Sequence, residues 1–121
     1  MSFEWQRVIG CISGAISVGA SAYGAHGLKP KKGEAFSKTF DTGARLQLLH
    51  SILLTAVPSI SGGYRTRAAT VSGAFLTVGM ALFSGSCYAV GVTEDRKYGK
   101  AAPVGGLCLM AGWLSLGLIR K

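Results

Sequence analysis

Hydrophobic residues fall into four long stretches that contain no Asp, Glu, Lys or Arg, and short charged segments separate them. The stretches cover residues 8–28, 46–64, 68–93 and 101–119. A helix needs about 20 apolar residues to cross the hydrocarbon core of a bilayer, which is roughly 30 Å thick. Each stretch is long enough, so the pattern predicts four membrane-spanning helices, over residues 8–27, 45–63, 68–92 and 101–119.

The segment between the first two stretches has its own helical pattern. Phe36, Phe40 and Ala44 recur every four residues, and polar residues occupy the other faces. This pattern is typical of an amphipathic helix that lies in the membrane surface, and we place it over residues 34–44. The expected fold is therefore all-α: an integral membrane four-helix up-down bundle, one domain over residues 1–121, with a short in-plane amphipathic helix between helices one and two.

The first stretch has an alternative interpretation as a signal peptide. Arg7 precedes an apolar run that ends in small residues at 21–25, as such peptides do. We expect a helix that is retained.

Composition separates a membrane protein from the soluble classes. Charged residues make up 15% of the chain, against roughly 25% in an average soluble domain. A net charge of +8 is typical of nucleic-acid-binding proteins, but here the charges avoid the long stretches entirely. We therefore expect no nucleic-acid partner and expect the basic residues to contact anionic headgroups. The residues outside the stretches are too few for a separate soluble core, which excludes an extramembrane catalytic domain.

Small residues recur along one side of three of the predicted helices. In the first helix their spacing alternates between four and three residues, which keeps them on one face. Because lipid is as apolar as leucine, membrane helices associate through close packing at small residues. We therefore expect helix contacts at Gly10, Gly14, Ser17, Ser21 and Gly24 in the first helix, Ala81, Gly85 and Ala89 in the third, and Gly105, Gly106 and Gly112 in the fourth.

The three cysteines do not form a recognisable disulfide or metal motif. Cys11, Cys87 and Cys108 all lie within predicted spans and lack the spacing of a zinc site. We interpret them as small packing residues and expect no metal.

Polar residues that could carry chemistry gather at one end of the predicted bundle. They are His26 at the end of the first helix, and Asp41, Arg45, Gln47 and His50 around the start of the second. An ionisable residue within a span is a functional candidate because burying its charge is costly. His50 is the strongest candidate on that ground.

Three interpretations of this group stay open. His26 and His50 are able to ligate haem or a metal, or to border a quinone site. Asp41, Arg45 and His50 are able to form a proton or anion pathway. Alternatively, His50 and Gln47 bond to neighbouring helices while Arg45 reaches the headgroups. No nucleophile, phosphate-loop or paired-carboxylate motif is present, so we expect no catalytic residue, no enzyme activity and no cofactor.

Several short motifs then suggest a family. Gly24-Ala25-His26-Gly27, Gln47 with His50, and Pro103 with Gly105-Gly106 stand in an order that resembles a small membrane family, which includes animal transmembrane protein 256 and bacterial inner-membrane relatives. The resemblance covers almost the whole chain. It implies a four-helix membrane protein of uncharacterised function, located in the mitochondrial inner membrane in a eukaryotic member. The basic insert of Lys29, Lys31 and Lys32 departs from the family pattern, and we expect it to contact lipid headgroups or a partner.

Two functional hypotheses follow. The first is a non-catalytic accessory subunit that contributes helix and lipid contacts to a larger inner-membrane assembly such as a respiratory-chain complex. The second is a small transporter or proton-conducting bundle that uses Asp41, Arg45 and His50.

Overall fold

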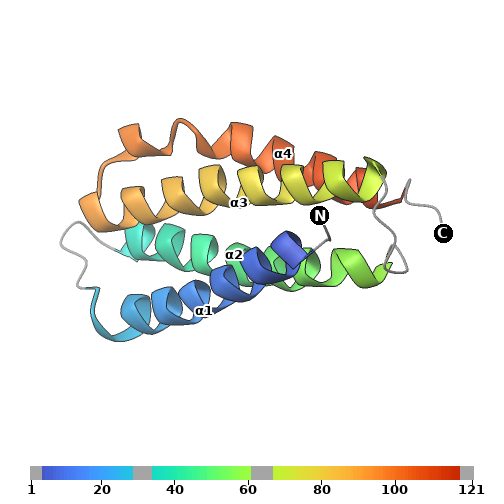
Figure 1. The fold of residues 1–121 in the computed structure, drawn as a ribbon. Helices are drawn as coiled ribbons and strands as arrows, with labels where there is room; N and C mark the ends of the chain where they lie inside the picture. Colours follow the sequence, from blue (N-terminus) through green and yellow to red (C-terminus); the bar gives the residue numbers. More distant parts are fainter. Residues whose placement is uncertain (1–3, 29–33, 61–66, 118–121) are drawn as a thin grey trace.

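The computed structural model describes residues 4–28, 34–60 and 67–117, and all regular structure within them is helical. Successive long helices run in alternating directions, as Figure 1 shows. The four helices that the sequence predicts are present. They are α1 (Glu4–His26), α2 (Glu34–Ile60), α3 (Arg67–Thr93) and α4 (Ala102–Leu116), with a short 3₁₀ helix, η1 (Arg96–Gly99), before α4.

The helices pack in the order in which the chain forms them. The extensive contacts are those of α1 with α2, α2 with α3, and α3 with α4. In Figure 1, α1 and α4 accordingly lie at opposite edges of the molecule. Of the most apolar stretch of α1, 11% is buried within the chain, whereas 44% of the corresponding stretch of α3 is buried. The first helix therefore leaves most of its surface uncovered.

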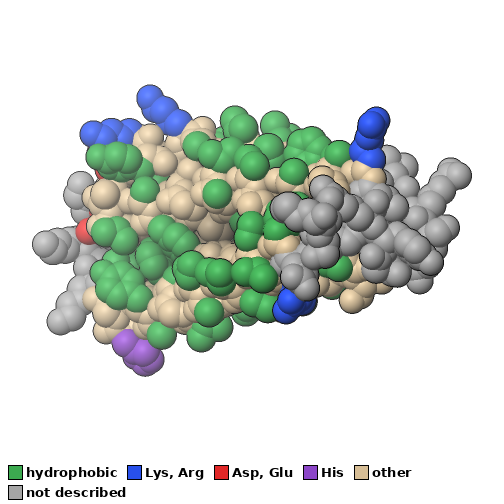
Figure 2. Space-filling model, viewed as in Figure 1, with side chains coloured by type: hydrophobic (Ala, Val, Ile, Leu, Met, Phe, Trp, Pro, Cys, Tyr) green, Lys and Arg blue, Asp and Glu red, His purple; other side chains and the backbone are tan. Residues whose placement is uncertain are grey.

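Two helices are long and apolar enough to cross a membrane, over Trp5–His26 and Ala69–Thr93. The second helix carries Lys38, Asp41 and Arg45 in its first half, and α4 has 15 described residues, fewer than a span of about 20 requires. Figure 2 shows hydrophobic side chains over the middle of one face and Lys and Arg towards its two ends. This distribution is typical of a membrane protein.

The expected boundary between an in-plane helix and the second span is absent from the described structure. Residues 34–60 form one continuous helix, α2, which at 1.5 Å per residue is about 40 Å long. The stripe that suggested a membrane-surface helix is instead covered by protein. Phe40 is buried, its ring lies 4.9 Å from that of Tyr88, and Ala44 is also buried. A continuous helix therefore satisfies the same hydrophobic pattern.

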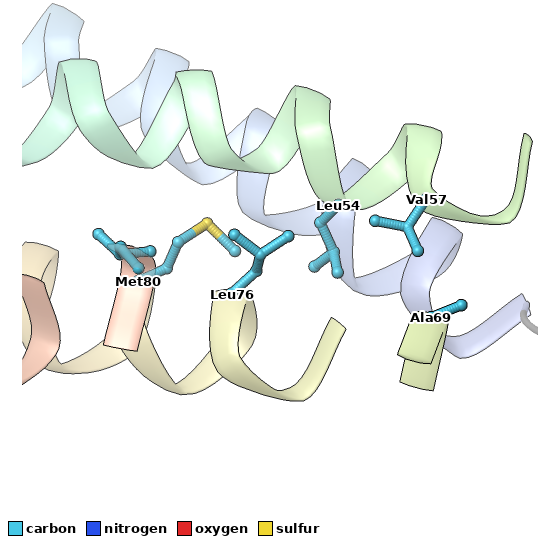
Figure 3. Close-up of a cluster of buried hydrophobic side chains, with 6 residues drawn as sticks. Leu54, Val57, Ala69, Leu76 and Met80 are labelled. Carbon is cyan, nitrogen blue, oxygen red and sulfur yellow. The ribbon is translucent and has the colours of Figure 1, made fainter. Parts of the chain in front are cut away.

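A hydrophobic core joins α2, α3 and α4. Leu54 and Val57 of α2 face Ala69, Leu76 and Met80 of α3, as Figure 3 shows. Leu109 of α4 completes the cluster. Truncating a buried leucine in such a core costs about 2–5 kcal/mol. This cluster anchors the end of the molecule at which α2 ends and α3 begins.

Glycines allow close approach of helices at several of the expected positions. A Cβ atom on Gly10 would lie 2.9 Å from the backbone nitrogen of Thr55, and one on Gly105 would lie 2.5 Å from that of Phe83. Gly24 packs on Phe40, and Gly112 packs on Leu76 in the same way. Backbones therefore approach each other across α1–α2 and α3–α4, as the stripes predict.

Other positions in the stripes behave differently. Ser21, Ala81 and Gly85 are exposed, and no atom lies within 4 Å of a Cβ built on Gly85. The spacing identifies a face of small residues, but it does not reveal whether another helix covers that face. The remaining positions range from buried to half-buried: Gly14, Ser17, Ala89 and Gly106.

Close approaches also occur at glycines outside the stripes. A Cβ on Gly43 would lie 2.6 Å from that of Cys87, and one on Gly91 would lie 2.6 Å from that of Phe40. Gly79 packs on Leu109. These positions define the α2–α3 and α3–α4 contacts that the spacing argument misses.

Candidate functional site

His50 joins α2 to α4 through Nε2, while its Nδ1 bonds within α2. The indole Nε1 of Trp113 donates to His50 Nε2 at 3.0 Å, and His50 Nδ1 lies 2.6 Å from the carbonyl oxygen of Leu46. An indole N–H only donates, so Nε2 is the acceptor and Nδ1 carries the proton that it gives to the carbonyl. His50 is 6% exposed. Its neutral ring is thus fully engaged in helix contacts.

Gln47 holds three helices together near the centre of the molecule. Its Nε2 donates to the carbonyl oxygen of Ser13 at 3.1 Å and to Ser13 Oγ at 3.0 Å. Its Oε1 accepts from the hydroxyl of Tyr88. The Oγ of Ser51 lies 2.7 Å from that of Ser13. We call Ser13, Gln47, Ser51 and Tyr88 the central polar cluster.

Three members of this cluster, Ser13, Gln47 and Tyr88, form the floor of an open groove between α1 and α3. The groove has a volume of about 360 Å³. Ile9, Ile12 and Ile16 form the α1 wall, and Ala81 and Gly85 lie on the α3 wall. The remaining lining residues are Ser13, Gln47, Thr77, Met80, Ser84 and Tyr88. A polar floor between apolar walls is thus accessible from the side of the bundle.

The remaining members of the predicted polar group do not join these contacts. His26, Asp41 and Arg45 are exposed. Asp41 lies beside α1, since its Oδ1 would be 3.0 Å from a Cβ on Gly24. In the part of the chain that the structure describes, no ion pair joins Asp41 to Arg45. The five predicted residues therefore divide into two buried contact residues and three exposed ones.

Sequence reasoning missed Ser13, Ser51 and Tyr88. Ser51 directly follows His50 and lies four residues after Gln47, about one helical turn further on. This spacing was a signal for Ser51. Tyr88 and Ser13 carry no comparable signal, because they join the cluster only through the packing of α1 and α3 on α2.

The described residues do not gather ligands for a metal. Among residues 4–28, 34–60 and 67–117, no group of three or more His, Cys, Asp or Glu side chains is close enough to hold an ion. Cys11 is exposed, Cys87 is buried and Cys108 is half-buried, and all three are free. Lys29, Lys31 and Lys32 lie outside the described residues, so their expected contact with headgroups or a partner stays a prediction.

Comparisons with known proteins find a family match. The model of the family described as "Protein of unknown function (DUF423)" matches residues 20–106. A UPF0382 membrane protein of Staphylococcus haemolyticus is 35% identical over 111 residues, which are 90% of this chain and 88% of that protein. The UPF0382 inner membrane protein YgdD of Escherichia coli is 31% identical over 125 residues, 99% of this chain and 93% of that protein. No solved structure matches the chain.

Proposed function

Since this chain belongs to the DUF423 family of membrane proteins, we propose that it is a non-catalytic accessory subunit whose groove between α1 and α3 receives a helix of another membrane protein. We further propose that all four helices cross the membrane as an up-down bundle. The names of the bacterial relatives mention neither mitochondria nor a respiratory complex, so the proposal does not specify the assembly.

The open groove is the observation that carries this proposal. Membrane helices associate through small residues that let backbones approach, and polar side chains strengthen the contact. Ala81 and Gly85 offer such a surface on α3, and no part of the described chain occupies the space in front of Gly85. The α1 wall adds Ile12 and Ile16, which are 56% and 55% exposed. One helix of a partner would cover both walls.

The described contacts do not favour the alternative of a transporter or proton-conducting bundle. Such a pathway needs groups that exchange protons or bind ions along a route. Both ring nitrogens of His50 are engaged, and Asp41 and Arg45 are exposed. We therefore propose the accessory role alone.

A groove-filling substitution tests the proposal. Native membranes would be extracted in mild detergent and separated by native electrophoresis, and the migration of the chain would be measured. We expect the wild type to migrate with a larger complex at fixed stoichiometry. Gly85→Leu would fill the groove and release the chain, because its side chain points into open space that the partner helix would need.

Gly19→Leu is the matched control. Gly19 also faces open space, with no atom within 4 Å of its Cβ position, but it does not line the groove. We expect this variant to stay in the complex. A wild-type chain that migrates alone, or a Gly85→Leu variant that stays in the complex as the control does, would contradict the proposal.

A further inference from the structure

The start of α4 leaves a second cavity at the end of the molecule where α3 ends. After α3 the chain turns through η1 and comes back along α3, so that a Cβ on Gly99 would lie 3.1 Å from Val90 Cγ2. The fourth helix therefore begins beside α3, short of its end (Figure 1). The cavity has a volume of about 170 Å³. Its lining residues are Thr39, Ser86, Cys87, Val90, Arg96, Gly99 and Ala102.

Ser86 presents an unused hydroxyl to this cavity. The residue is 7% exposed, and within the described chain its side chain has no hydrogen-bond partner. Neighbouring hydroxyls on α3 differ in this respect: Ser84 donates to the carbonyl oxygen of Gly43 at 2.9 Å, and Thr93 donates to that of Ala89 at 2.5 Å. The fully enclosed oxygen without a partner in the described chain is Gln6 Oε1, so the Ser86 hydroxyl remains reachable from the cavity. Ser86 is therefore suited to bind something that enters the cavity.

The N-terminus of α4 supplies backbone donors at the same place. Ala101 is the N-cap residue, and no side chain caps the helix. Ala102, the first residue of α4, lines the cavity. The first N–H groups of a helix lack partners within it, and the helix dipole adds partial positive charge there. Such an end attracts an anion.

Arg96 is held at the cavity with most of its donors free. Its Cζ lies 4.7 Å from the ring centroid of Phe36, and its Nη1 donates to Thr39 Oγ1 at 3.1 Å. Among the described residues no carboxylate pairs with it, whereas Asp95 pairs with Lys97 at 3.8 Å. A guanidinium has five N–H donors arranged to match the oxygens of a carboxylate or a phosphate. The other donors of Arg96 therefore remain available for a ligand.

We propose that this cavity binds a phosphate group, either in a phospholipid headgroup or as free phosphate. A phosphate has several strong acceptor oxygens, enough for the guanidinium of Arg96, the hydroxyl of Ser86 and the backbone at Ala102. At about 30 Å³ per water molecule, the cavity has the volume of five to six waters, which is enough for a phosphate. Lys100, directly after η1, adds positive charge nearby.

Ligand binding by the purified full-length chain in detergent tests this proposal. Native mass spectrometry would measure dissociation constants for dihexanoyl phosphatidylglycerol, for dihexanoylglycerol, which lacks the phosphate, and for inorganic phosphate. We expect phosphatidylglycerol to bind more tightly than dihexanoylglycerol. Arg96→Gln should weaken phosphatidylglycerol binding by about tenfold or more, since hydrogen bonds to charged groups are among the strong ones. Ser86→Ala should weaken it by about threefold to tenfold.

Lys97→Ala is the matched control, since it also removes one positive charge from η1 but does not line the cavity. We expect its affinity to equal that of the wild type. If inorganic phosphate binds in a way that depends on Arg96, and phosphatidylglycerol binds no more tightly than dihexanoylglycerol, the site is supported and its ligand is free phosphate. Equal binding of both lipids without Arg96-dependent binding of inorganic phosphate, or equal losses in Lys97→Ala and Arg96→Gln, would overturn the proposal. Ser86→Ala keeps the test decisive if Arg96→Gln does not fold, because the hydroxyl it removes bonds to no described residue.

Discussion

Replacing Gly10 by alanine tests the closest contact between α1 and α2. The new Cβ would lie 2.9 Å from Thr55 N and 3.0 Å from Ser51 O, whereas ordinary contact begins at 3.4 Å. Both atoms belong to the backbone of α2, so no side-chain rotation relieves the overlap and the helices have to separate. Overpacking of this kind costs about 1–3 kcal/mol. Alanine also favours the helix by roughly 0.5–1 kcal/mol relative to glycine, which offsets part of the cost.

Gly19→Ala is the control, because this glycine lies in the same helix and faces open space. The difference between the two variants therefore measures the cost of the overlap at Gly10 without the gain from helix propensity. We expect the free energy of unfolding of Gly10→Ala to be lower than that of Gly19→Ala by about 1–3 kcal/mol. The two values would be measured by titrating the purified protein in mild detergent with sodium dodecyl sulfate and following tryptophan fluorescence. Equal stabilities would refute the reasoning, since they would mean that α1 and α2 do not approach each other at Gly10.

The same unfolding assay checks the two polar contacts of α2. Trp113→Phe leaves the buried acceptor His50 Nε2 without its donor and should lower the free energy of unfolding by about 1–3 kcal/mol; an unchanged value would show that this bond does not hold α4. Gln47→Leu leaves the Tyr88 hydroxyl without its acceptor and should cost about 1–3 kcal/mol. Adding Tyr88→Phe should cost less in that background than in the wild type, and strictly additive costs would argue against the bond.

The hydrophobic pattern predicts the helices but not what covers them. Phe36, Phe40 and Ala44 have the spacing of an amphipathic helix, and spacing alone does not distinguish a membrane surface from a neighbouring helix. In the structure, Phe40 packs on Tyr88 of α3, and α2 continues without a break. The four long helices were therefore predictable from local sequence. The expected division of residues 34–60 into an in-plane helix and a span was not, because the apolar stripe of this segment packs on a distant helix.

Local spacing likewise does not reveal what covers each glycine or which residues complete the candidate site. Gly10 and Gly85 both stand in stripes of small residues, but one packs on a backbone and the other faces a groove. Gln47 and His50 were identifiable because polar residues are rare within apolar stretches. Their partners Ser13, Tyr88 and Trp113 come from other helices, and no local pattern marks them.

Packing in chain order makes the molecule resemble a linear array more than a closed bundle. In such an array, stability is approximately a sum of terms for each unit and for each pair of neighbours, as in repeat proteins. The helices α2 and α3 each have two extensive neighbours, whereas α1 and α4 each have one. A force applied at the N-terminus would therefore detach α1 first and leave the core of Leu54, Leu76 and Leu109 intact. Amide hydrogens in α2 and α3 should accordingly exchange last.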